Sequence, residues 1–150
     1  MKIWIDADSC PKLVRDFTLK YAAKFSVQIF LVANKTILSE SQFPFMMIVC
    51  EKGKDSADNY ILEHASSGDI IITRDVLLAE KSISKNICTI NDRGLKFTRD
   101  NIARIIEDRN YNFSMAQIGF ASEKKVTYGK KEFAQFVKCF EKSFSDEKRK

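Results

Sequence analysis

Residues 3–32 read IWIDADSCPKLVRDFTLKYAAKFSVQIFLV, and the topology of the protein follows from this stretch. Residues 3–5 and 27–32 are short apolar runs with the length of buried strands. The segment between them begins at Pro11 and repeats apolar side chains at helical spacing. A strand, a helix and a second strand in this order predict a β-α-β unit in which the two strands are parallel.

The same alternation of short apolar runs and helical patterns continues along the chain. Runs of strand length occur at residues 45–50, 69–73 and 87–90, and helical patterns occur at 55–66 and 76–84. The runs are almost entirely apolar, as expected when helices cover both faces of a sheet. We therefore predict an α/β fold with a mainly parallel, five-stranded sheet.

The last third of the chain has a different pattern. A helix capped by Thr98 is expected to end at about residue 108, and a short aromatic segment follows at 111–118. Residues 119–129 are polar and bounded by glycines, which predicts a loop. An amphipathic helix is expected from about 130 to 143, followed by a frayed basic tail at about 144–150.

Composition narrows the class of protein. A length of 150 residues and a mass of 17.2 kDa indicate a single domain over residues 1–150. With 45% hydrophobic residues, five glycines and two prolines, the chain is neither collagenous nor wholly disordered. Four cysteines without a C-x-x-C pair and a single histidine give no zinc-ligand spacing. The longest apolar stretch is too short to cross a bilayer, so we expect a cytoplasmic protein with no membrane contact.

The net charge of +5 is concentrated late in the sequence. Residues 121–150 carry nine basic and five acidic side chains, which permits a polyanionic partner such as RNA. A solvated tail of mixed charge would explain the same excess. RNA is thus the expected partner; the sequence identifies no protein partner and is compatible with a homodimer.

Aspartates occur where the strands of a parallel sheet would end. Side chains that follow such strands meet in the crevice beyond their carboxyl ends. Two acids follow the first strand, one follows the fourth, and two open the helix before the fourth: Asp6, Asp8, Asp75, Asp55 and Asp58. Asp69 precedes the fourth strand and is expected at the opposite edge. Each acid could also serve as an ordinary helix cap, but their coincidence at one edge favours a shared site.

Clustered carboxylates repel one another, at about 4 kcal/mol for an ionised pair 4 Å apart at an effective dielectric of 20. A divalent cation removes this repulsion, and oxygen ligands without cysteine or histidine suit Mg²⁺ or Mn²⁺. Such ions bridge carboxylates to phosphates and activate water, so the pattern points to phosphoryl-ester chemistry.

Several motifs together resemble a known family. Residues 5–11 (IDADSCP), 31–34 (LVAN), 53–61 (GKDSADNYI), 68–75 (GDIIITRD), 93–94 (RG) and 98–102 (TRDNI) resemble, in this order, the YaiI/YqxD family of bacterial proteins. That family is similar to PIN-like and NYN-type domains. The resemblance implies a three-layer α/β/α sandwich, strand order 3-2-1-4-5, and an acidic Mg²⁺ or Mn²⁺ site of the kind used to cleave RNA. Two departures are Val76-Leu77, where the family often has a proline, and residues 121–128, which replace a Gly/Pro-rich segment.

The leading hypothesis is therefore a metal-dependent phosphodiester hydrolase that acts on single-stranded RNA with one or two metal ions. The predicted metal ligands are Asp6, Asp8, Asp55, Asp58 and Asp75, and the predicted catalytic residues are Asp6, Asp8, Asp58 and Asp75. The predicted substrate contacts are Asn34, Thr73, Arg74, Arg93 and Lys96.

Two alternatives stay open from the sequence. Asp6-Ala-Asp8 after an apolar strand also fits a haloacid-dehalogenase-type phosphatase, with Asp6 as nucleophile, Asp8 as general acid/base and Thr73 as phosphate ligand. The second alternative is an RNA-binding or regulatory module that keeps the acidic pocket without catalysing a reaction.

Overall fold

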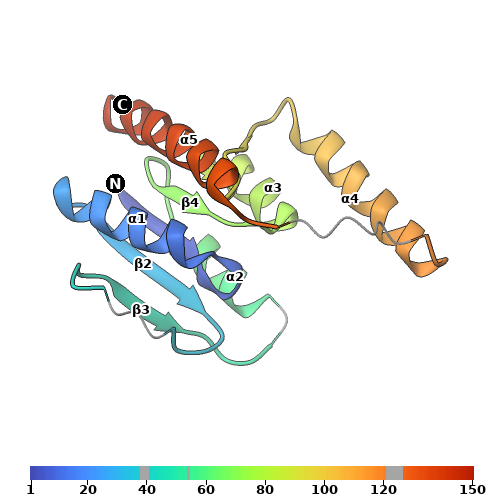
Figure 1. Ribbon diagram of the computed structural model, residues 1–150, viewed down its shortest axis with the longest axis horizontal. Helices are drawn as coiled ribbons and strands as arrows, with labels where there is room; N and C mark the ends of the chain where they lie inside the picture. Colours follow the sequence, from blue (N-terminus) through green and yellow to red (C-terminus); the bar gives the residue numbers. More distant parts are fainter. Residues whose placement is uncertain (38–40, 54, 121–126) are drawn as a thin grey trace.

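The computed structural model describes residues 1–37, 41–53, 55–120 and 127–150 (Figure 1). Within these residues six strands form one sheet: β1 (Lys2–Asp6), β2 (Gln28–Ala33), β3 (Met46–Val49), β4 (Ile70–Ile72), β5 (Cys88–Ile90) and β6 (Lys96–Phe97). Their order is β3-β2-β1-β4-β5-β6. The first five are parallel, which confirms the predicted order 3-2-1-4-5. The sixth strand was not predicted, and it pairs with β5 in the antiparallel direction.

Helices cover both faces of this sheet. They are the short 3-10 helix η1 (Ala7–Ser9) and the α-helices α1 (Lys12–Lys24), α2 (Ser56–His64), α3 (Val76–Ser84), α4 (Ile102–Gln117) and α5 (Lys130–Lys148). Ile3 and Ile5 of β1 belong to the core beneath α1 and α5, whereas Trp4 belongs to the core beneath α2 and α3. Successive side chains of a strand point to opposite faces, so β1 is buried on both. The fold is a three-layer α/β/α arrangement.

The C-terminal helix is longer than the sequence pattern predicts. We expected a frayed tail from about residue 144, but α5 continues to Lys148. Phe144 is buried with Phe136 and Phe140 in the core that α5 shares with α1. Phe144 extends the apolar stripe of the helix by one more turn, and its burial explains why the expected fraying does not occur.

Helix α4 also differs from the expectation. It begins at Ile102 and not at Thr98, and the aromatic segment at 111–118 is the second half of this helix and not a separate element. This half projects from the body of the protein (Figure 1) and exposes large apolar side chains. The predicted loop at 119–129 falls largely on residues 121–126, which lie outside the described residues.

Within the described chain, no helix combines the length and the apolar character needed to cross a bilayer.

Candidate metal centre

The carboxyl ends of the parallel strands bring the predicted acids to one edge of the sheet. Asp6 is the last residue of β1, and Asp75 follows β4 at the N-terminus of α3. Asp55 and Asp58 lie at the N-terminal end of α2. This edge is the usual location of ligand sites in open α/β sheets.

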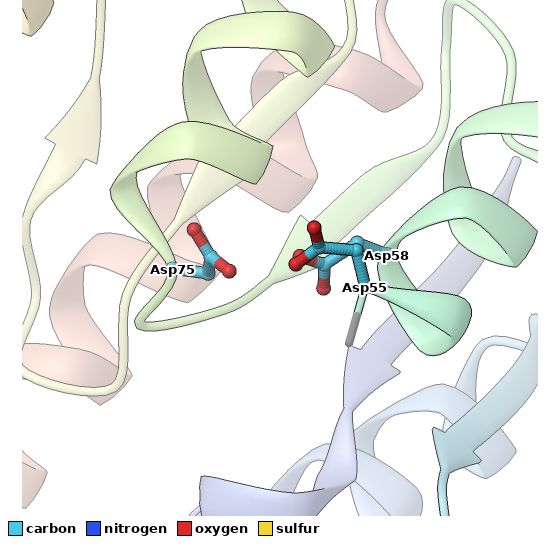
Figure 2. Close-up of side chains that lie close together, drawn as sticks. All are labelled: Asp55, Asp58 and Asp75. Carbon is cyan, nitrogen blue, oxygen red and sulfur yellow. The ribbon is translucent and has the colours of Figure 1, made fainter. Parts of the chain in front are cut away.

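Three carboxylates converge closely at this edge. Asp55, Asp58 and Asp75 each offer a carboxylate oxygen, and these oxygens all lie within 4.8 Å of one another. Figure 2 shows the two α2 aspartates facing Asp75 across a gap between the helix ends. We call these residues the three-aspartate group. Its spacing is compatible with ligation of a single metal ion by all three side chains.

Local backbone conformation places two of these acids in different ways. Asp75 caps α3, because its Oδ1 accepts hydrogen bonds from the amides of Leu77 (2.9 Å) and Leu78 (3.1 Å). Asp55 occupies the cap position of α2 but makes no capping hydrogen bond, and its backbone is left-handed with φ of 69°. A non-glycine residue in that region is strained by about 1–2 kcal/mol. The carboxylate of Asp55 is thus used for the group and not for the helix.

Thr73 connects β1 to the start of α3. Its Oγ1 donates a hydrogen bond to Oδ2 of Asp6 (2.9 Å) and accepts one from the amide of Asp75 (2.9 Å). Thr73 is 2% exposed, so this bridge is buried beneath the site. The structure therefore gives this predicted substrate contact a positioning role toward two acids.

Asn34 connects three further segments. Its backbone N–H donates a hydrogen bond to Oδ2 of Asp8 (2.9 Å), and its side-chain Oδ1 accepts one from Oγ of Ser56 (3.0 Å). Asn34 follows β2, Asp8 lies in η1 and Ser56 begins α2. The residue thereby fixes the distance between Asp8 and the helix that carries Asp55 and Asp58.

Asp6 and Asp8 lie beside the three-aspartate group but are not part of it. The pKa of Asp6 is raised, mainly by burial and further by the charges of Asp75 and Asp8, while the Thr73 hydrogen bond opposes the shift. The influence of Asp75 on Asp6 indicates that they are electrostatic neighbours. The structure thus brings three of the five predicted ligands into direct proximity and keeps two adjacent.

Within the three-aspartate group, Asp58 has a strongly raised pKa. Its pKa is raised to about 7, first by desolvation, then by a hydrogen bond to Asp75 and by the charges of Asp75, Asp6 and Asp55. The described residues form two ion pairs, Arg74–Asp92 and Lys150–Glu147, and neither neutralises one of these acids. A bound cation would relieve the repulsion that raises this pKa.

A half-buried ion pair involves Arg74, the residue next to Asp75. Nε and Nη2 of Arg74 donate to Oδ2 of Asp92 at 2.8 and 2.6 Å, and Asp92 is 2% exposed. Tyr128 donates its hydroxyl hydrogen bond to the carbonyl of Asp92 (2.7 Å), and the guanidinium of Arg93 lies 5.6 Å from the Tyr128 ring centroid. Arg74 and Arg93 therefore belong to one cluster, which also includes the unpredicted Asp92.

Sequence reasoning could have found Asp92. It follows β5 by two residues, and the rule that selected Asp6 and Asp75, an acid just after a parallel strand, applies to it equally. The last predicted contact, Lys96, lies on β6 and lines a groove with Arg93.

Three other polar or nucleophilic residues do not belong to the candidate site. Asp69 lies at the amino end of the sheet, where it accepts hydrogen bonds from the amides of Lys2 and Ser66 and from the indole of Trp4. His64 is exposed at the end of α2. Burial raises the pKa of the Cys10 thiol to about 12, so this cysteine is not an activated nucleophile.

Comparison with known proteins places the chain in a family. Residues 4–146 match the model described as "Uncharacterized BCR, YaiI/YqxD family". A UPF0178 protein of Treponema denticola is 40% identical over 136 residues, covering 91% of this chain and 86% of that protein. A UPF0178 protein of Pseudomonas putida is 32% identical over 142 residues, 95% of each chain. No solved structure matches the chain. This protein therefore belongs to the YaiI/YqxD family.

Proposed function

We propose that this protein is a metal-dependent phosphodiester hydrolase that cleaves single-stranded RNA. The observation that carries the proposal is the three-aspartate group, in which oxygens of Asp55, Asp58 and Asp75 lie within 4.8 Å of one another without a basic partner among the described ion pairs. The donors are all carboxylate oxygens, which suit Mg²⁺ or Mn²⁺ better than zinc or copper. When bound, such an ion polarises a phosphate and lowers the pKa of water.

The side chains of the site then have separate tasks. In a loaded site Asp55 and Asp75 would hold the cation from two helix ends, and Asp58 would accept a proton from the attacking water. The pKa of Asp58 is about 7 without the ion, and the positive charge of the ion would lower it, so that this carboxylate would be ionised at neutral pH. Asp6 and Asp8 extend the negative site on the side of β1 and could hold a second cation. Arg74, whose side chain is 43% exposed beside Asp75, can contact a phosphate through its remaining N–H groups.

RNA is proposed as substrate on three grounds. The chain resembles PIN-like domains, for which acidic sites of this kind are used on RNA, and it carries a net charge of +5 that favours a polyanion. Arg93 and Tyr128 lie beside Asp92 and offer a cation and an aromatic ring close to the acids. Charged and aromatic groups together are typical of single-strand binding.

The test is cleavage of end-labelled single-stranded RNA in Mn²⁺ and in Mg²⁺. Asp58→Asn and Asp75→Asn should each reduce the rate by about 100-fold or more, since each removes a metal ligand or the base. Asp16→Asn is the matched control, because Asp16 is an exposed aspartate of α1. Equal cleavage by all four proteins would identify a contaminating nuclease and remove the proposal.

The same preparation distinguishes the two alternatives. Hydrolysis of a phosphomonoester with capture of beryllium fluoride at Asp6 would favour the phosphatase. Salt-sensitive RNA binding without cleavage in either metal, unaffected by Asp6→Asn, would favour a binding module.

A further inference from the structure

A basic groove lies between the β5–β6 turn and α5. A cavity of about 620 Å³ is bounded by the β5–β6 turn, β6 and α5. Four of its lining side chains are cationic, Arg93, Lys96, Lys138 and Lys142, and one is acidic, Asp146. The groove thus holds a net charge of +3 in a protein whose total is +5. The other described cavities are lined by side chains with a net charge of +1 or 0.

The walls of this groove are held in place by close backbone packing. Gly94, in the β5–β6 turn, has a φ of +86°, and a Cβ atom built there would lie 2.4 Å from the carbonyl oxygen of Gln135 in α5. Only glycine permits both this conformation and this approach. The turn that carries Arg93 is therefore fixed against the helix that carries Lys138 and Lys142, so the backbone positions of these cationic residues are set before any ligand binds.

A continuous set of contacts joins the groove to the metal centre. Arg93 lines the groove and also lies over the ring of Tyr128. Tyr128 donates to the carbonyl of Asp92, and the carboxylate of Asp92 holds Arg74, the residue next to Asp75. Arg74, next to Asp75, and Arg93, at the edge of the groove, thus belong to one network of contacts through Asp92 and Tyr128.

We infer that this groove binds the phosphate backbone of single-stranded RNA on one side of the bond that is cleaved. The inference rests on the proposed function and names the path of its substrate. The lysines supply charge for the backbone, while Leu95, which is 38% exposed, and the lysine stems supply apolar surface for bases. An acidic peptide would use the charges but not the connection to the metal centre, which is why RNA is the preferred ligand.

The experiment measures binding separately from cleavage. A fluorescent 12-nucleotide RNA is titrated in EDTA over a series of salt concentrations against wild type and Lys138→Gln/Lys142→Gln. Both lysines are exposed residues of α5, so the fold should be retained. We expect at least about tenfold weaker binding in the double variant, and a log–log salt slope that is smaller by about 1.4, since each lost phosphate contact on a single strand contributes about 0.7.

The matched control is Lys20→Gln/Lys24→Gln, which removes two exposed lysines at the same spacing from α1. It should change neither the affinity nor the slope by a comparable amount. Cleavage of a dinucleotide by the wild type is measured in parallel, as a readout of the proposed hydrolase that is separate from binding of the longer RNA.

Each result has a distinct meaning. Equal weakening by the two double variants, or none by either, would overturn the groove. A fluorescent poly-glutamate peptide is titrated in the same way. If the groove variant loses more affinity for this peptide than for RNA, the groove is assigned to an acidic protein and the RNA inference is overturned. Loss of RNA binding in the groove variant with no cleavage by wild type would leave the groove standing and reject the proposed hydrolase. If the wild type cleaves the dinucleotide but does not bind the 12-nucleotide RNA, the proposed hydrolase stands and the groove is rejected.

Discussion

Asp75 uses its two carboxylate oxygens for different purposes. Oδ1 accepts two backbone hydrogen bonds at the start of α3, while the carboxylate also faces Asp55 and Asp58. Asparagine is as good a helix cap as aspartate but carries no charge. We therefore expect Asp75→Asn to melt close to the wild-type temperature, and we expect Mn²⁺ to raise the melting temperature of the wild type but not of this variant, as measured by differential scanning fluorimetry.

Asp75→Ala is the companion variant, because it also removes the cap. It should lose about 1 kcal/mol of stability in addition to the metal effect. An equal and large destabilisation by Asn and Ala would mean that charge at this position supports the fold itself.

The ionisation of Asp58 predicts how stability depends on pH. Its pKa of about 7 in the folded protein lies above its ordinary value of 3.8. The folded state thus holds this proton more tightly, and the resulting stability is complete below about pH 3.8 and lost as the pH rises through 7. In EDTA, urea unfolding should show wild type losing more stability between pH 5 and pH 8 than Asp58→Asn does.

Mg²⁺ should reverse this loss, because it binds the ionised carboxylates. Its stabilising effect is expected to be larger at pH 8 than at pH 5. A shift of equal size at both pH values would show that the cation binds elsewhere.

The location of the acids could be predicted from sequence, but their contacts could not. The rule of strand ends placed Asp6, Asp55, Asp58 and Asp75 at one edge, where they are. It could not tell that Thr73 would turn its hydroxyl toward Asp6, because one residue after a strand leaves the side-chain direction undetermined. The left-handed backbone of Asp55 could not be predicted either, since the sequence there is typical of a normal helix cap.

Among the secondary-structure elements, β1 and β4 are tied together by one buried carboxylate. Asp69, 4% exposed, accepts hydrogen bonds from the Lys2 amide (2.8 Å), the Trp4 indole (3.1 Å) and the Ser66 amide (3.0 Å). Asp69→Ala would leave the buried indole N–H of Trp4 without a partner and would remove two partly buried hydrogen bonds, so we expect a loss of about 2–4 kcal/mol in urea unfolding. Metal affinity of the folded fraction should be unchanged, because Asp69 lies at the opposite edge.

Helix α5 supplies a second prediction. Phe144 is 2% exposed and packs against Tyr21 and Phe25 of the α1 region, with centroid distances of 5.0 and 5.1 Å. Phe144→Ala should therefore cost about 3–5 kcal/mol, the range for a fully buried phenylalanine. Ser145→Ala, at an exposed neighbouring position, should cost less than about 0.5 kcal/mol. If Phe144→Ala and Ser145→Ala both have similarly small effects, the end of α5 is frayed, as the charge pattern predicts.

The elements that sequence patterns missed are those with little pattern to read. Strand β6 has two residues, Lys96–Phe97, which is too short for alternation to appear. Helix α4 was expected to end near Asp108 because Arg109, Asn110 and Asn112 interrupt the apolar spacing. These polar residues are exposed on a helix that projects from the domain, where packing places no demand on them. The long, almost wholly apolar strands β1 and β2 were predicted because both faces are buried.

For the molecule as a whole, the projecting half of α4 predicts self-association. Tyr111, Phe113, Ile118 and Phe120 are 62–69% exposed, which leaves roughly 450 Å² of apolar surface in contact with water. The charges of α4 cancel, so a second copy is not repelled. Pairing two copies would bury only part of this area on each, because Tyr111 and Phe113, two residues apart, face different sides of α4, so the contact falls below the size of a stable interface. We expect a weak homodimer whose light-scattering mass rises toward twice 17.2 kDa with concentration.

Phe113→Ser/Ile118→Ser should keep the mass at that of one chain over the same range. Leu13→Ser is the control, because Leu13 is 53% exposed on α1, away from α4. A concentration-dependent mass in the double variant would place the contact on another surface.

The position of α5 also bears on the order of folding during synthesis. This helix covers the sheet face formed by β1, β2 and β4, strands that leave the ribosome long before residues 130–148 do. Until then Ile3, Ile5 and Leu31 are covered by α1 but not by α5, and the nascent chain exposes part of an unfinished core. We therefore expect native structure in this protein to form late in translation and cooperatively, once α5 has docked on the sheet.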